Sequence, residues 1–107
     1  MAKTREQLKP NYAPLYCAAM YPLLAGIFHD HGYALAVHGS LARDFDVIAV
    51  PWAEKVSKPE TVLRAIKKKT AVEQYTRRSN RSHGRVAYFL NVGFGECGID
   101  LSFFPAV

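Results

Sequence analysis

The sequence predicts an α+β domain, with two to three helices packed on one face of a mixed or antiparallel sheet of about five strands. Apolar residues recur at three- and four-residue steps in residues 14–31 and 59–69, which is the period of an amphipathic helix. Alternating apolar residues or short apolar runs predict five strands, at residues 33–38, 44–50, 72–78, 85–92 and 99–104. Helices and strands in this order are typical of helices layered on a single sheet.

The length of 107 residues predicts one domain, and a hydrophobic content of 50% is enough for a core. We expect residues 1–13 to form a polar N-terminal arm and residues 14–107 to form the domain. Two distant cysteines, Cys17 and Cys97, and a polar N-terminus lead us to expect free thiols and a cytoplasmic protein. We expect no membrane association, because no apolar run approaches the ~20 residues of a spanning helix.

Residues 14–31 are predicted to form the first helix. Pro14 suits its first turn, whereas Pro22 predicts a kink, or a break with a second helix starting there. Gly32 should end the helix as a left-handed cap. The predicted apolar stripe consists of Leu15, Ala18, Ala19, Leu23, Ile27 and Phe28.

Residues 33–38 and 44–50 should be neighbouring antiparallel strands, because the connector between them is short. Residues 47–50 are a continuous apolar run, which is typical of a strand covered on both faces. Pro51 should end this strand.

The second helix, residues 59–69, is predicted to begin with a capping box in which Ser57 caps and Glu60 reaches back. Its predicted buried stripe is Val62, Leu63 and Ile66. The lysines at 67–69 lie in its last turn, where cations complement the helix dipole. Residues 79–84 then read as a turn and residues 93–98 as a glycine-rich reversal.

The candidate site surrounds residues 39–46. Gly39 would let a phosphate approach the backbone, and Ser40 offers a hydroxyl and an N–H. Asp44 and Asp46 lie two residues apart, so in a strand their carboxylates share one face and repel unless a cation lies between them. Mg²⁺ is commonly held by one or two carboxylates and substrate phosphates, so this pattern indicates metal-assisted phosphoryl chemistry.

These residues resemble the signature of the polymerase-beta-like nucleotidyltransferase superfamily, here in a minimal form. That signature is a Gly-Ser pair, an Asp-x-Asp at the start of an apolar strand, and a third carboxylate on a later strand, a position that suits Asp100. The resemblance covers roughly residues 33–104, with only residues 41–43 between the Ser and the first Asp. The chain is also similar to small uncharacterised proteins encoded by phages and prophages.

The resemblance implies a protein that binds a nucleoside triphosphate with Mg²⁺ and transfers a nucleotidyl group to a nucleic-acid, protein or small acceptor. The implied metal ligands and catalytic residues are Asp44, Asp46 and Asp100, with Asp100 also as base toward the acceptor hydroxyl. The implied nucleotide-binding residues are Gly39, Ser40 and Arg43. A phage-encoded chain would work in the host-cell cytoplasm. A partner subunit or a second copy would supply the surface for a large acceptor.

Two other interpretations stay open. The chain could be a non-catalytic accessory protein that binds a nucleotide, a nucleic acid or a host protein through the same surface. It could also be a structural protein in which Asp46 only pairs with Arg43 or Arg85 and Asp100 with a neighbouring arginine. His38 would point near the site, but a lone histidine is more often structural, and the four histidines lack zinc-ligand spacing.

A basic cluster surrounds the predicted turn at 79–84, with Tyr75 and Tyr88 nearby. Cations interleaved with aromatic residues suit phosphate contacts and base stacking, and a solvated turn explains them equally well. The formal net charge of +5 likewise fits an anionic partner or a solvated basic face. The candidate anion or nucleic-acid contacts are Arg77, Arg78, Arg81, His83 and Arg85.

Overall fold

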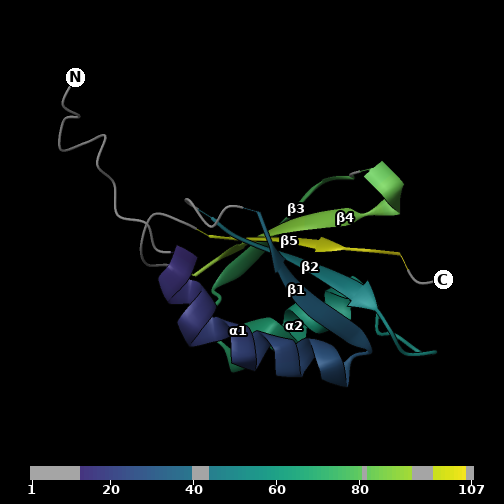
Figure 1. Cartoon of the computed structure of the whole chain (residues 1–107), viewed down its shortest axis with the longest axis horizontal. Helices are drawn as coiled ribbons and strands as arrows, with labels where there is room; N and C mark the ends of the chain where they lie inside the picture. The colour runs from purple at the N-terminus through teal and green to yellow at the C-terminus, as the bar shows by residue number, and fades with distance from the viewer. Residues whose placement is uncertain (1–12, 40–43, 81, 93–97, 106–107) are drawn as a thin grey trace.

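The computed structural model describes residues 13–39, 44–80, 82–92 and 98–105 (Figure 1). The elements in chain order are α1 (Ala13–Asp30), β1 (Tyr33–His38), β2 (Phe45–Pro51), α2 (Pro59–Lys69), β3 (Gln74–Asn80), η1 (Ser82–Gly84), β4 (Val86–Asn91) and β5 (Ile99–Phe103). The predicted α+β class is therefore confirmed, with two α-helices in the described part of the chain. The predicted arm, residues 1–13, lies outside it except for its last residue, which begins α1.

The described strands form one five-stranded sheet in the order β1-β2-β5-β4-β3. β1 and β2 pair antiparallel, as predicted, and β3, β4 and β5 form an antiparallel meander. β2 and β5 pair in parallel, so the sheet is mixed. Figure 1 shows α1 and α2 on the same side of this sheet, so in the described part of the chain the other side carries no α-helix.

The core lies between the sheet and the two helices. Every second residue of the central strands faces the helices and is buried, as Phe45, Val47 and Ala49 show in β2. The ring of Phe103 packs against Phe28 of α1 and against Tyr33, with ring centroids 5.7 and 5.3 Å apart. The largest fully buried side chains in the described residues are Leu24, Phe28, Phe45, Val47, Val62, Leu63, Ile66, Leu90, Ile99, Leu101 and Phe103.

The expectation that β2 is covered on both faces is wrong. Ile48 is only half-buried and Val50 is 38% exposed, because both helices lie on the opposite side. We call the side of the sheet that carries these two residues the open face. Side chains in β5 alternate in the same way: Ile99 and Leu101 lie in the core, and Asp100 lies on the open face.

α1 runs through Pro22 as one helix, so the break, one of the two predicted alternatives, does not occur. Pro22 lies on the exposed side of the helix, where water can satisfy the carbonyl that loses its partner. The buried face also differs from the predicted stripe, because Leu24 is 1% exposed whereas Leu23 is 47% exposed. Met20 is buried, and Ala19 is exposed. Ile27 and Phe28 are buried as predicted, and the side chains of Leu15 and Ala18 lie outside the described ones.

Gly32 ends α1 in the left-handed conformation, as predicted, with φ of 90°. A Cβ at this position would lie 2.6 Å from the carbonyl oxygen of Lys55, so glycine is required for two reasons. The Gly32 carbonyl accepts the N–H of Trp52 at 3.0 Å. This turn therefore joins the end of α1 to the segment that follows β2.

The predicted capping box at the start of α2 is wrong. Lys58 is the N-cap and, within the described residues, makes no side-chain capping bond. The Ser57 hydroxyl instead hydrogen-bonds His31 Nδ1 at 2.7 Å, and Glu60 accepts the hydroxyl of Tyr88 at 3.1 Å. Contacts with distant elements thus outweigh the local pattern. The helix bounds and the predicted buried stripe of Val62, Leu63 and Ile66 are confirmed.

β3 begins and ends two residues later than the predicted 72–78. A register irregularity between Arg77 and Asn80 lets the strand continue into residues predicted as turn. The reversal is then made by η1, where His83 has a φ of 63°. Most of the predicted glycine-rich reversal, residues 93–97, lies outside the described residues.

Truncating two adjacent leucines of α1 should have very different effects. Leu24→Ala should lower the free energy of unfolding by about 2–5 kcal/mol, because it leaves a cavity in the core. Leu23→Ala should change it by about 0.5 kcal/mol or less, because that side chain is largely in solvent. Urea unfolding of both variants measures the difference. Similar losses in the two variants would contradict the placement of α1.

The contact between Glu60 and Tyr88 should make stability depend on pH. The pKa of the Glu60 carboxyl lies below its ordinary value, first because its own backbone N–H donates to it and then because of the Tyr88 hydroxyl. A depressed folded-state pKa stabilises the fold above the unfolded-state pKa of about 4.3, and this stabilisation is lost as pH falls below it.

Glu60→Gln should therefore flatten the fall in melting temperature between neutral and acid pH. The effect should be small, because the carboxylate is exposed. Glu54→Gln changes another exposed carboxylate and should leave the wild-type profile in place. Identical profiles for the two variants would show that the Glu60 contact is not coupled to folding.

Candidate functional site

A row of side chains crosses the open face of the sheet. His38 of β1 is the register partner of Asp46 in β2, and Asp46 is the partner of Asp100 in β5. Phe89 of β4 is in turn the partner of Asp100. Two of the three predicted acidic residues are thereby brought side by side, on strands that lie about 4.8 Å apart. We call His38, Asp46, Asp100 and Phe89 the acidic row.

Asp44 lies beside this row, directly before β2 and two residues from Asp46. Phe45, between Asp44 and Asp46, is fully buried, whereas both aspartates are half-buried. An Asp44 oxygen, Oδ1, accepts the backbone N–H of Gly98 at 3.4 Å, and the Phe45 N–H donates to the Gly98 carbonyl at 3.0 Å. The start of β2 is therefore tied to the residue that leads into β5.

Gly39 directly follows β1 and lies against Asp46 of the row. Its φ is 80°, and a Cβ on it would lie 2.5 Å from the Asp46 oxygen Oδ2. Within the described residues, the group that lies close to the Gly39 backbone is therefore the Asp46 carboxylate. The prediction that Gly39 also approaches a phosphate stays a prediction. Ser40 and Arg43, the other predicted nucleotide contacts, lie outside the described residues.

The Asp100 oxygen Oδ1 is buried although the residue lies on the open face. Two carboxylates on paired strands repel each other, and a cation between them removes that cost. Mg²⁺ fits this pair as it fits many protein sites, with two carboxylates and the remaining ligands from phosphate oxygens and water. Within the described residues, no three His, Cys, Asp or Glu side chains are grouped so that they could hold a metal alone.

The predicted basic cluster does not form one surface in the described residues. The guanidinium group of Arg77 donates to Asn80 at 3.1 Å, and its charge contributes to lowering the pKa of Glu60 on the helix side of the sheet. Arg78 lies over the ring of Phe89, with the guanidinium carbon 4.8 Å from the ring centroid. Arg85 lies over Phe104 at 5.5 Å. His83 is exposed in η1, and Arg81 lies outside the described residues.

Phe89 and Gly98 are site residues that the sequence prediction missed. A Cβ on Gly98 would overlap the ring of Phe89, so the glycine lets this ring lie against the backbone beside Asp44. The alternation in β4, where Tyr88 and Leu90 are buried, already places Phe89 on the open face. A large aromatic residue at such a position was the available indication.

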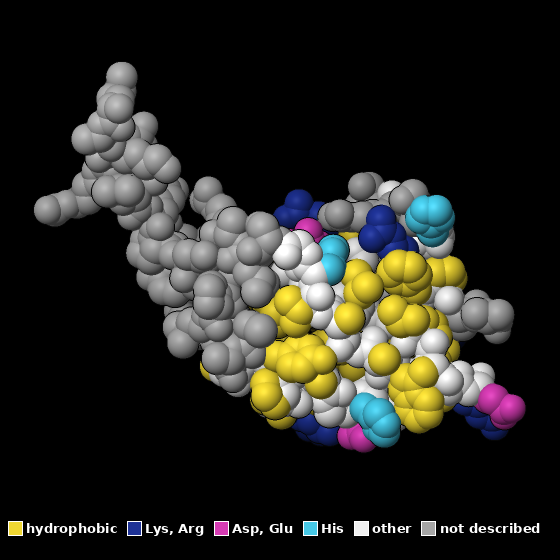
Figure 2. All heavy atoms as spheres, in the orientation of Figure 1, with side chains coloured by type: hydrophobic (Ala, Val, Ile, Leu, Met, Phe, Trp, Pro, Cys, Tyr) yellow, Lys and Arg dark blue, Asp and Glu magenta, His cyan; other side chains and the backbone are white. Residues whose placement is uncertain are grey.

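Figure 2 shows acidic, histidine and basic side chains along the upper edge of the molecule and again along its lower edge, with a largely hydrophobic surface between them. The exposed large hydrophobic side chains among the described residues are Leu23, Val37, Val50 and Trp52. Trp52 stacks on His29 of α1, with ring centroids 4.9 Å apart. The charged groups are therefore not spread evenly over the surface.

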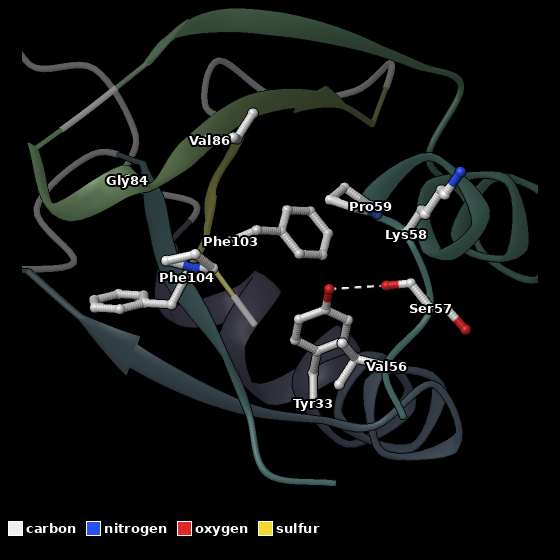
Figure 3. A pocket seen from close by; sticks show the side chains of 10 residues that line it. Tyr33, Val56, Ser57, Lys58, Pro59, Gly84, Val86, Phe103 and Phe104 are labelled. Atoms are coloured by element: carbon white, nitrogen blue, oxygen red, sulfur yellow. Dashed lines mark hydrogen bonds between the residues drawn. The ribbon is translucent and has the colours of Figure 1, made fainter. Parts of the chain in front are cut away.

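An apolar pocket of about 300 Å³ lies at the other end of the sheet, near the start of β1 and the end of β5 (Figure 3). The Tyr33 hydroxyl points into it and donates to the Ser57 carbonyl at 2.8 Å. Burial raises the pKa of this hydroxyl, and the Glu60 charge raises it further, so it remains a donor at neutral pH. The pocket is lined by Tyr33, Val56, Ser57, Lys58, Pro59, Gly84, Val86, Phe103, Phe104 and Pro105.

The comparisons with known proteins add no relative. No family model matches the chain, and neither the curated proteins nor the solved structures contain a match. Among the described helices, none is long and apolar enough to cross a membrane.

Replacing Gly39 tests how the acidic row is built. Gly39→Ala should destabilise the fold by about 1–2 kcal/mol through its positive φ, and further through contact with the Asp46 carboxylate. In an Asp46→Ala background the added loss should shrink, giving a coupling of about 0.5 kcal/mol or more. Urea unfolding of the double-mutant cycle measures it. Equal losses in both backgrounds would mean that the carboxylate does not require glycine at this position.

Proposed function

We propose that the acidic row binds a nucleoside triphosphate through Mg²⁺ and that the protein transfers the nucleotidyl group to an acceptor hydroxyl. The observation that supports this most directly is the register pairing of Asp46 with Asp100 on adjacent parallel strands. Asp44 lies directly before β2, two residues from Asp46, so all three predicted carboxylates belong to the starts of two paired strands, although the described side chains do not group the three into one metal site. The resemblance of residues 39–50 and 98–103 to the superfamily signature supports the same proposal.

Each part of the row has a task in this proposal. Asp44, Asp46 and Asp100 would hold the metal ions, which when bound would supply positive charge against the charge that develops during transfer. Gly39, Ser40 and Arg43 lie between β1 and β2 and contact the phosphates. His38, the register partner of Asp46, borders the nucleotide.

The proposed reaction is an in-line displacement at the α-phosphorus. The acceptor oxygen forms a new bond to this phosphorus, and the bond from the α-phosphorus to the oxygen that bridges to the β-phosphate breaks. Pyrophosphate leaves with the bonding electron pair, and Asp100 takes the proton of the acceptor hydroxyl. No oxidant or reductant is required, so the nucleotide and the acceptor are the complete set of reactants.

Nucleotide binding should raise the melting temperature in a way that needs both Mg²⁺ and the acidic row. With each nucleoside triphosphate at about 100 times its Kd, mass action adds about 2.7 kcal/mol of stability, a shift of several degrees. Asp46→Asn should abolish the shift without lowering the melting temperature of the free protein. Asp30→Asn makes the same chemical change at an exposed position of α1 and should keep the shift.

Two outcomes would count against the proposal. A shift that persists in Asp46→Asn, or that needs no Mg²⁺, would move nucleotide binding away from the row. A Mg²⁺-dependent shift without release of pyrophosphate in the presence of oligonucleotide, protein and small-molecule acceptors would favour the non-catalytic binding protein.

A further inference from the structure

Arg78 stands next to the acidic row on the open face of the sheet. Its predecessor Arg77 is the register partner of the buried Tyr88, so Arg78 faces the other way. Its guanidinium group lies over the ring of Phe89, which is the register partner of Asp100. Arg78 is therefore held over an aromatic ring near the carboxylates, whereas the lysines at the end of α2 are exposed to solvent.

Arg85 repeats this arrangement further along the same face. Its guanidinium group lies over the ring of Phe104. Figure 3 shows the rings of Phe103 and Phe104 pointing in opposite directions, with Phe103 toward the pocket. Since Phe103 belongs to the core, Phe104 and the arginine above it belong to the open face.

The spacing of the two arginine–phenylalanine pairs follows from the strands. Arg85 directly precedes β4 and lies four residues from Phe89, and Phe104 directly follows β5 and lies four residues from Asp100. At about 3.3 Å per residue, each separation is about 13 Å. The two arginine–phenylalanine pairs therefore follow one another along β4 and β5. The Arg78–Phe89 pair lies at the acidic row, and the Arg85–Phe104 pair lies further from it.

We infer that Arg78 on Phe89 and Arg85 on Phe104 bind single-stranded nucleic acid along β4 and β5, and that this strand is the acceptor of the proposed reaction. Its role as acceptor rests on the proposed function, whereas the binding itself does not. Guanidinium groups contact backbone phosphates, and bases stack on aromatic rings and on the planes of arginine side chains.

A single strand fits this surface better than a duplex or a simple anion. Its bases are free to stack, and a chain of phosphates can reach both arginines, whereas a small anion reaches only one. The end of the strand at Phe89 would bring a terminal hydroxyl beside Asp100, the residue proposed to take its proton. The net charge of +5 favours the approach of such a polyanion.

The test measures binding of a fluorescein-labelled oligodeoxythymidine of about 12 nucleotides by fluorescence anisotropy, without Mg²⁺ or nucleoside triphosphate. Arg78→Ala and Arg85→Ala should each weaken binding about fivefold or more. Each should also reduce the slope of log K against log salt by about 0.7, the value for one phosphate contact on a single strand. Arg64→Ala removes an exposed arginine of α2 on the opposite side of the sheet and should change neither quantity.

Three results would overturn the inference. They are no measurable binding by the wild type, an equal loss in Arg64→Ala, and equally tight binding of an inorganic polyphosphate of the same charge. Thermal melts of the arginine variants exclude unfolding as the cause of any loss. Asp46→Asn should retain oligonucleotide binding while it loses the Mg²⁺-dependent nucleotide shift, so failure of the row and failure of this surface give different results.

Discussion

The parallel pairing of β2 with β5 is the constraint on which the rest of the structure depends. It joins the hairpin of β1 and β2 to the meander of β3, β4 and β5. Because the two strands are parallel, the chain between them must return from the carboxyl end of β2 to the amino end of β5. That crossover contains α2, β3 and β4, so the pairing also decides which face the helix covers. Because side chains alternate along both strands, the same pairing buries Phe45 and Ile99 and sets Asp46 beside Asp100.

One face of the sheet holds the fold together and the other is available for function. On the helix side, Phe28, Tyr33 and Phe103 pack ring against ring, and α2 adds a fully buried stripe. On the open face the same strands carry carboxylates, arginines and the rings of Phe89 and Phe104. Substitutions of the exposed side chains on the open face should therefore affect binding more than stability, whereas Ala87 and Ser102 are buried on that face.

The parts of the fold that local pattern determines were predictable, and the parts that depend on distant partners were not. The spacing of apolar residues in α2 and the short connector between β1 and β2 were sufficient to predict the bounds of these three elements within one residue. Ser57 and Glu60 have the spacing of a capping box. Their side chains instead hydrogen-bond residues far away in sequence, Ser57 with His31 and Glu60 with Tyr88. Of the site, the alternation of β2 and β5 predicted which aspartates share a face, whereas Phe89 and Gly98 matter only because β4 pairs with β5.

The paired carboxylates occupy positions where like charges are costly to a sheet. Like charges on directly paired strands destabilise a sheet, and Asp46 and Asp100 occupy paired positions near the starts of two inner strands. Gly39 must also adopt a left-handed conformation beside Asp46, which adds conformational cost at the same place. Residues that break the local rules of a fold in this way are concentrated at functional sites. A divalent cation with an anionic substrate would remove the repulsion, and this is the physical reason to look for the function of the protein at this row.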